Sequence, residues 1–156
     1  MFDDSPLRYN SVGGDEQPYP KNSPDIYEGL MDLNDALKKS KNTIAIRLFN
    51  MLGAETIYRS LTEDFGLTSI VRSGKNDKGI SVTDLAEAPL ALGQLSFGVP
   101  LRSITEAYNV FPGNGVFVKG NSYFCVLNKD GKEILASESE KKRVFDASTA
   151  LSLIHI

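Results

Sequence analysis

Three consecutive helical patterns constrain the fold of this chain most, because residues 32–66 leave almost no sequence to connect them. Apolar residues recur at helical spacing and predict helices over 33–39, 42–52 and 54–64. Asp32 is a typical N-cap before the first of these helices. Gly53 and Gly66 are placed to end the second and the third.

The sequence on either side of this segment is less regular. Residues 1–29 are rich in Pro, Gly, Asp and Asn, which predicts ordered loop with short extended pieces. The segment 81–84, Ser-Val-Thr-Asp, fits a capping box that opens a short apolar segment over 85–92. Pro100 suits the first position of a further helix that runs to about residue 111.

The last third of the chain changes character. Residues 116–118 and 123–127 are β-rich, and the Asp-Gly within 128–132 is a hairpin turn signal before a return strand over 133–136. Residues 137–143 are expected to form a charged loop, with a last helix starting near Asp146 or Ser148. The predicted class is α+β, with short helices followed by one β-hairpin. Since a lone hairpin is only marginally stable, the chain looks like the middle of a larger domain.

Composition excludes several function classes. The chain has 156 residues with 17 basic and 20 acidic side chains, and a net charge of −3 without a basic cluster argues against nucleic-acid binding. No apolar run of 18 residues is present, and the N-terminus lacks the pattern of a signal peptide. One cysteine, Cys125, excludes an internal disulfide and is expected to be a small core residue.

Metal chemistry is not indicated either. The only histidine is His155, which rules out a histidine-based zinc site and disfavours a Ser-His-Asp triad. Acid–base chemistry would therefore fall to lysines, carboxylates or hydroxyls. The acidic residues near the N-terminus match no cation-binding pattern and are expected to form a solvated loop; they are Asp3, Asp4, Asp15 and Glu16.

The tripeptide Ser40-Lys41-Asn42, between two predicted helices, is the sharpest chemical feature. Taken alone, Ser-x-Asn is a weak signal. One alternative is a helix boundary at which Ser40 or Asn42 caps the following helix.

The surrounding sequence, 35–48, resembles the second active-site motif of the penicillin-binding transpeptidases: an Ala-Leu helix end, Ser-x-Asn, and a helix closed by Leu-Gly. Further landmarks similar to that family occur in order along nearly the whole chain. They are Asp4-Ser5-Pro6, Pro20-Lys21-Asn22, Gly29-Leu30, residues 90–101, residues 107–115, Asp130-Gly131-Lys132, Arg143-Val144-Phe145 and Thr149-Ala150. These landmarks resemble most those of the bifunctional, class A enzymes.

This resemblance implies a β-lactamase/transpeptidase-like fold and a role for two residues. A serine activated by lysine is acylated by the D-Ala-D-Ala end of a stem peptide. Ser40 would relay a proton between the motif lysines and the leaving amine. Asn42 would hydrogen-bond the substrate amide and the catalytic lysine, since an amide both donates and accepts. Lys41, at the variable middle position, is expected to be solvated and not catalytic.

Two parts of the family's site are missing from the sequence. No Lys-Thr-Gly or Lys-Ser-Gly occurs, and the one Ser-x-x-Lys, starting at Ser139, follows Ser-x-Asn in a charged loop and is given no role. The expectation is a truncated product in which residues 1–150 form a partial transpeptidase domain, mostly its helical subdomain. Residues 151–156 resemble a sequencing adapter read in frame, the alternative being a genuine start of an apolar helix.

The resemblance also implies an activity and its partners. The intact enzyme would be a D,D-transpeptidase that cross-links peptidoglycan stem peptides, with a lipid-linked precursor as a further partner and β-lactams as covalent inhibitors. It would need no metal or organic cofactor. An upstream glycosyltransferase domain and membrane anchor would place it on the outer face of the bacterial cytoplasmic membrane. The alternatives are a serine β-lactamase or β-lactam sensor of the same fold, and a non-catalytic module that binds wall polymer or a divisome partner.

Overall fold

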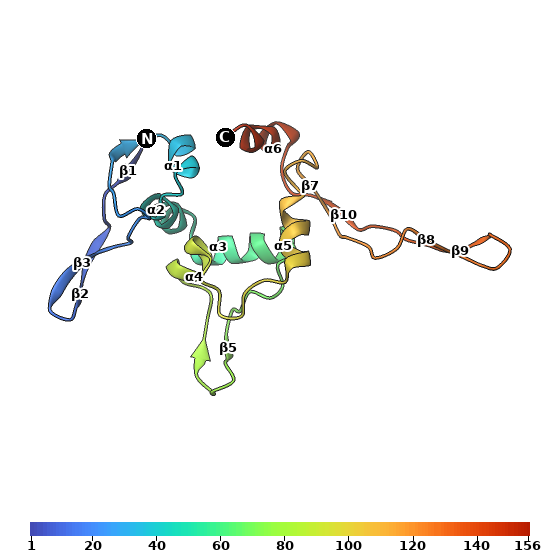
Figure 1. Ribbon diagram of the computed structural model, residues 1–156, viewed down its shortest axis with the longest axis horizontal. Helices are drawn as coiled ribbons and strands as arrows, with labels where there is room; N and C mark the ends of the chain where they lie inside the picture. The colour runs from blue at the N-terminus through green and yellow to red at the C-terminus, as the bar shows by residue number, and fades with distance from the viewer. The chain divides into compact units, whose positions relative to one another are not determined.

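The chain contains short helices and short antiparallel strands, and every sheet has only two strands. The computed structural model (Figure 1) describes residues 1–156. The chain divides into two compact units. The first unit comprises residues 1–59, 69–98 and Ile156. The second comprises residues 60–68 and 99–155.

The first unit contains four helices and six strands. In chain order they are β1 (Phe2–Asp4), β2 (Arg8–Val12), β3 (Asp15–Tyr19), β4 (Gly29–Met31), α1 (Leu33–Lys38), α2 (Asn42–Leu52), α3 (Ala54–Arg59), β5 (Gly74–Lys75), β6 (Ser81–Val82) and α4 (Glu87–Leu92). Strand β1 pairs with β4, β2 with β3, and β5 with β6. The β2–β3 hairpin turns at Gly13 and Gly14, whose φ values of 65° and 94° favour glycine.

The first two predicted helices are confirmed, and so are their local signals. The Asp32 carboxylate accepts a 2.8 Å hydrogen bond from the Asp35 N–H and caps α1. Gly53 adopts φ 81° directly after α2. The third predicted helix is confirmed over Ala54–Arg59 but continues as a π-helical turn, η1 (Ser60–Asp64), which belongs to the second unit.

The core of the first unit lies where α1, α2 and β4 meet. Met31, Ala36 and Ile44 are buried together, and Phe2 of β1 and Leu48 of α2 pack against them. Helix α2 also contacts α4, as Figure 1 shows.

The second unit contains α5 (Leu101–Tyr108), β7 (Val116–Val118), β8 (Cys125–Leu127), β9 (Glu133–Ala136), β10 (Lys141–Arg143) and α6 (Ala147–Ile154). Aromatic rings form much of its packing. The Phe145 ring lies 6.0 Å from the Phe65 ring and 5.7 Å from the Phe111 ring, within the range at which aromatic pairs attract. Val110 and Ala150 are fully buried in the same unit.

The structure corrects the prediction of a single hairpin. The expected β8–β9 hairpin is present, but Lys141–Arg143, expected to be charged loop, forms strand β10 and pairs with β7. All three β10 residues are exposed, so no alternation of apolar and polar residues marks the strand. Cys125 is also exposed on β8, which makes its placement in the core wrong.

Two predicted helix starts are wrong as well. Ser81 and Val82 lie in strand β6, and α4 begins later, at Glu87, without a side-chain cap. Pro100 is the N-cap of α5 and not its first residue, and this helix ends at Tyr108. None of the helices is both long and apolar enough to cross a bilayer.

Candidate active site

A tight helix–helix corner presents Ser40. The N–H of Ser40 donates to the Leu37 carbonyl at 3.1 Å, and the N–H of Lys41 donates to the Ala36 carbonyl at 3.0 Å. These two bonds form a Schellman motif at the end of α1, which requires a left-handed residue at the position of Ser40. Ser40 has φ 52°, where glycine is usual. A serine at this position costs backbone strain, and such strain clusters at functional sites.

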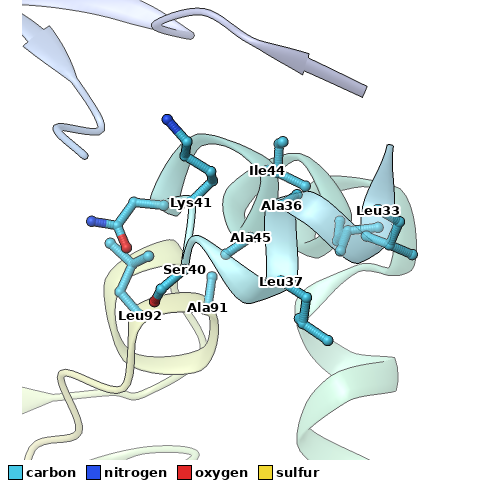
Figure 2. A pocket seen from close by; sticks show the side chains of 11 residues that line it. Leu33, Ala36, Leu37, Ser40, Lys41, Ile44, Ala45, Ala91 and Leu92 are labelled. Carbon is cyan, nitrogen blue, oxygen red and sulfur yellow. The ribbon is translucent and has the colours of Figure 1, made fainter. Parts of the chain in front are cut away.

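A pocket of about 250 Å³ opens beside this corner. Its walls are mostly apolar side chains of α1, α2 and α4, and its polar groups come from the corner; the lining residues are Leu33, Ala36, Leu37, Ser40, Lys41, Asn42, Ile44, Ala45, Leu48, Ala91 and Leu92. Figure 2 shows the Ser40 hydroxyl on the side of Ala91 and Leu92, whereas the Lys41 amine points away from them. The structure therefore brings the two predicted site residues, Ser40 and Asn42, to one pocket.

The Asn42 side chain makes one hydrogen bond within the protein. Its Nδ2 donates a 2.7 Å hydrogen bond to the Lys21 carbonyl. A side-chain amide has a second N–H and an acceptor oxygen, so this bond fixes the orientation of Asn42 and leaves hydrogen-bonding capacity for a ligand. The Ser40 side chain is exposed and is free to donate and accept.

Lys41 is not solvated, contrary to the sequence-based expectation. The residue is 7% exposed, and its Nζ lies 2.7 Å from Asp4 Oδ2, 3.1 Å from Glu28 Oε1 and 3.0 Å from the Ile26 carbonyl. An ammonium group has three donors, and all three are used here. Burial lowers the pKa of Lys41, but the hydrogen bonds to Asp4 and Glu28 outweigh that effect and raise it. A charged lysine whose three donors are all paired is not a base.

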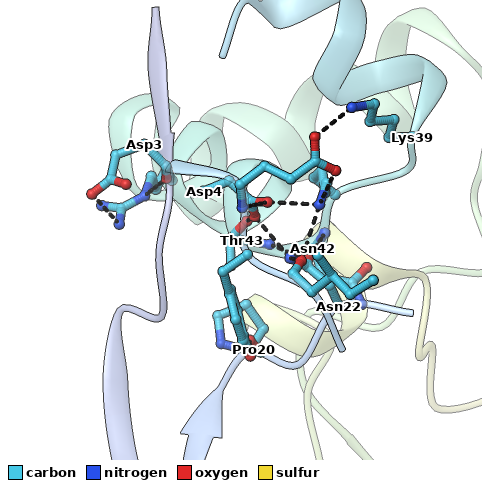
Figure 3. Close-up of polar contacts among 12 residues, drawn as sticks. Asp3, Asp4, Pro20, Asn22, Lys39, Asn42 and Thr43 are labelled. Carbon is cyan, nitrogen blue, oxygen red and sulfur yellow. Dashed lines mark hydrogen bonds and ion pairs between the residues drawn. The ribbon is translucent and has the colours of Figure 1, made fainter. Parts of the chain in front are cut away.

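Asp4 is the centre of the network behind the corner (Figure 3). Its side chain is 0% exposed. Its Oδ1 accepts from Asn22 Nδ2 at 2.7 Å and from the Thr43 hydroxyl, and its Oδ2 accepts from Lys41 and from the Glu28 N–H at 3.0 Å. Burial alone would raise the pKa of Asp4, but these hydrogen bonds outweigh that effect and lower the pKa to about 2. Asp4 is therefore a buried carboxylate, and its assignment to a solvated acidic loop is wrong.

Helix α2 is capped by a residue distant in sequence. The Asn22 side-chain oxygen accepts from the N–H of Asn42 at 3.0 Å and from that of Thr43 at 3.4 Å. These are free donors at the start of a helix, which a local side chain usually satisfies. Lys41 is the N-cap by position and makes no side-chain cap bond. The alternative in which Ser40 or Asn42 caps the helix is therefore wrong.

Asp4 and Asn22 bind the Ser40-Lys41-Asn42 corner, and local sequence patterns did not identify them. Neither has a spacing that predicts contact with Ser40-Lys41-Asn42. The signal available was the resemblance itself, since Asp4, Pro20 and Asn22 are three of its landmarks. The structure buries all three residues in the first unit, and Figure 3 shows them beside Thr43.

The remaining chemical features lie elsewhere. Ser139 belongs to the second unit, where its hydroxyl accepts a 2.9 Å hydrogen bond from Asn121. No group of three or more His, Cys, Asp or Glu side chains is arranged to hold a metal ion.

No protein-family model matches the chain. Individual proteins do. Penicillin-binding protein 1A of Clostridium botulinum is 32% identical over 153 residues, which is 96% of this chain and 17% of the relative. Penicillin-binding protein 1A of Clostridium tetani is 37% identical over 145 residues, 89% of this chain. Over nearly its whole length, the chain is similar to penicillin-binding proteins 1A.

Solved penicillin-binding proteins have the same fold. Penicillin-binding protein 1A from Haemophilus influenzae superposes with a TM-score of 0.61 at 32% identity, over 90% of this chain and 19% of that protein. Penicillin-binding protein A from Mycobacterium tuberculosis, in a ceftriaxone acyl-enzyme complex, gives 0.70 at 18% identity, over 98% of this chain and 36% of that protein. The predicted α+β, transpeptidase-like fold is thus confirmed. The chain spans about a sixth of the length of the curated penicillin-binding proteins it matches.

Proposed function

We propose that this chain supplies part of the active site of a peptidoglycan D,D-transpeptidase, with Ser40 and Asn42 as its catalytic residues. One observation carries the proposal: a serine held at positive φ and an oriented asparagine share one pocket, in a chain related to penicillin-binding proteins. Retention of serine where glycine would relieve strain is expected when the hydroxyl has a chemical use.

The reaction has two steps. A serine Oγ outside these 156 residues attacks the carbonyl carbon of the penultimate D-Ala, the peptide C–N bond breaks, and the terminal D-Ala leaves with a proton. An amine of a neighbouring stem peptide then attacks the ester, forms the new amide and releases the serine. The Ser40 hydroxyl passes the proton to the leaving amine, because a hydroxyl donates and accepts at once.

Asn42 would hold the substrate amide beside this hydroxyl. Its bond to the Lys21 carbonyl fixes the plane of the side-chain amide, so its remaining N–H and its oxygen have a defined direction. Orienting groups of this kind lower the barrier by holding reactants in position. β-Lactams would acylate the same serine and would meet the same two side chains.

The wider setting belongs to the same proposal. Residues 1–150 would form part of the transpeptidase domain and residues 151–156 would not be native. The intact enzyme would act on stem peptides and a lipid-linked precursor at the outer face of the cytoplasmic membrane, anchored outside this segment. Flanking genomic sequence tests this setting: an upstream Ser-x-x-Lys and a downstream Lys-Thr-Gly are expected. Absence of both from the full gene would instead favour a non-catalytic wall-binding module.

The roles of the two residues are tested in the full-length protein that carries this sequence. Fluorescent penicillin labelling is followed over time in the wild type, in Ser40→Ala and in Asn42→Ala. We expect acylation to slow by roughly 100-fold or more in each variant, because Ser40→Ala removes a proton-transfer group and Asn42→Ala removes a group that orients the substrate. Wild-type rates in both variants would refute the assigned roles.

A further inference from the structure

Two separate parts of the Ser-x-Asn turn are tied to one buried carboxylate. Asp4 Oδ2 pairs with Lys41 at 2.7 Å, and Asp4 Oδ1 accepts from the Thr43 hydroxyl. Lys41 directly follows Ser40, and Thr43 directly follows Asn42. Each proposed catalytic side chain therefore has, as its neighbour in sequence, a residue bound to Asp4.

The same carboxylate is itself held in place. Strand β1 pairs with β4 so that Asp4 stands opposite Gly29, and the adjacent Glu28 N–H donates to Asp4 Oδ2 at 3.0 Å. Asn22 donates to Asp4 Oδ1 at 2.7 Å and accepts from the Asn42 N–H at 3.0 Å. The network thus connects a β-ladder to the start of α2 through buried, fully hydrogen-bonded groups.

Because this network is buried, its ion pair can fix the orientation of the corner. A buried ion pair is weak evidence of stability, because desolvation of the two charges offsets their attraction. A buried ion pair can instead favour one arrangement of the chain over others. An arrangement that separates the two partners leaves an uncompensated buried charge. Here the arrangement fixed is the direction in which the corner residues face: Lys41 toward Asp4, and its neighbours Ser40 and Asn42 toward the pocket.

We infer that Asp4, acting through Lys41 and Thr43, is a positioning residue that sets the orientation of Ser40 and Asn42 in the pocket. This inference rests on the proposed function and adds to it Asp4 and Thr43, which do not line the pocket. Asp4 does not line the pocket, so its effect must appear in the rate of a step that Ser40 and Asn42 perform.

The chain offers a matched control. Asp84 is equally buried, at 0% exposure, and its carboxylate accepts from the Val71 N–H at 2.7 Å and from the Ser96 N–H and hydroxyl at 2.8 and 2.7 Å. Asp84→Asn disturbs a buried carboxylate network of the same unit that has no bond to the Ser40 corner. A merely structural effect will therefore be alike in Asp4→Asn and Asp84→Asn.

The experiment measures the acylation rate constant in the full-length protein with excess fluorescent penicillin. Because this rate constant describes only molecules that react, loss of folded protein does not change it. We expect Asp4→Asn and Lys41→Met to slow acylation by roughly 10- to 100-fold, the effect of a displacement of about 1 Å. Asp84→Asn should lower the melting temperature and leave the rate constant within about twofold.

A double variant, and parallel measurements on Ser40→Ala and Asn42→Ala, complete the test. Asp4→Asn with Lys41→Met removes both charges together, so we expect a loss smaller than the product of the two single losses, as for residues in one network. Rates in Asp4→Asn and Lys41→Met that match Asp84→Asn would overturn the inference while slow Ser40→Ala and Asn42→Ala variants keep the proposed function intact. Unchanged rates in those two variants would instead remove the proposed function itself.

Discussion

The side-chain oxygen of Asn22 lies 3.0 Å from the backbone nitrogen of Asn42, although the two residues are 20 positions apart. A cap supplied from another segment makes the start of α2 depend on the N-terminal strands. The stability of this corner therefore depends on the 1–31 segment and not on local helix signals alone.

Asn22→Ala should destabilise the first unit by roughly 2 to 3 kcal/mol, because it removes a helix cap and leaves the buried Asp4 with one donor fewer. Asn128→Ala is the matched control. Asn128 also accepts two backbone N–H bonds, from Asp130 and Lys132, but in the exposed turn between β8 and β9. Its loss should cost about 1 kcal/mol or less. Calorimetry of the full-length variants checks both values, and equal costs would contradict the role of burial.

Ser40→Gly should separate stability from activity. Glycine relieves the positive φ at the Schellman position and should stabilise the corner by about 1 kcal/mol. The same change removes the proposed proton relay, so penicillin acylation should fall as far as in Ser40→Ala. Melting temperature and labelling rate are measured together on both variants. A glycine variant less stable than the alanine variant would show that the strain is not at Ser40.

Stability should depend on pH through Asp4. The pKa of Asp4 in the folded protein is about 2, below its ordinary value of 3.8. A carboxyl with a depressed pKa stabilises the fold above pH 3.8 and loses that contribution as the pH falls from there toward 2. The expected contribution is about 2 kcal/mol at neutral pH. Urea unfolding at pH 7 and near pH 3 tests this.

The Asp4→Asn variant is the reference for that measurement. Its unfolding free energy should fall less steeply between pH 5 and about 2.5 than that of the wild type, since one coupled carboxyl is gone. Parallel pH profiles in the two proteins would mean that Asp4 has an ordinary pKa in the folded state.

A prediction for the second unit rests on Gly115. This residue has φ 80°, and a Cβ built on it would lie 2.0 Å from the Phe145 carbonyl oxygen. Gly115→Ala should therefore destabilise the unit by roughly 3 kcal/mol, from steric overlap and backbone strain together. Gly131→Ala is the control, because Gly131 has φ 77° with nothing within 4 Å and should cost only about 1 kcal/mol. Thermal melts of both variants distinguish overlap from strain.

Local signals in the sequence were sufficient for α1 and α2. Asp32 caps the first helix and Gly53 ends the second, and both are short-range effects that a sequence shows directly. The α1–α2 corner could be placed for the same reason. The fold class followed from the order of family landmarks and not from the helices.

Contacts between segments far apart in the sequence could not be predicted from such local signals. A lysine in a polar turn has the pattern of a solvated residue, and only the folded chain brings Asp4 and Glu28 to Lys41. Strand β10 is recognisable only by its pairing with β7, because its three residues are all basic and exposed. Cys125 had a β-rich context that does not distinguish a covered strand from an exposed one.

The link between α1 and α2 is too short to tolerate a change in length. An insertion or deletion of one residue between Lys39 and Asn42 would disrupt the two hydrogen bonds that close α1, because both depend on the spacing of Ser40 and Lys41 from Ala36 and Leu37. It would also shift Asn42 relative to the pocket and the α2 N–H groups relative to Asn22. We therefore expect this corner to accept substitutions more readily than changes in length.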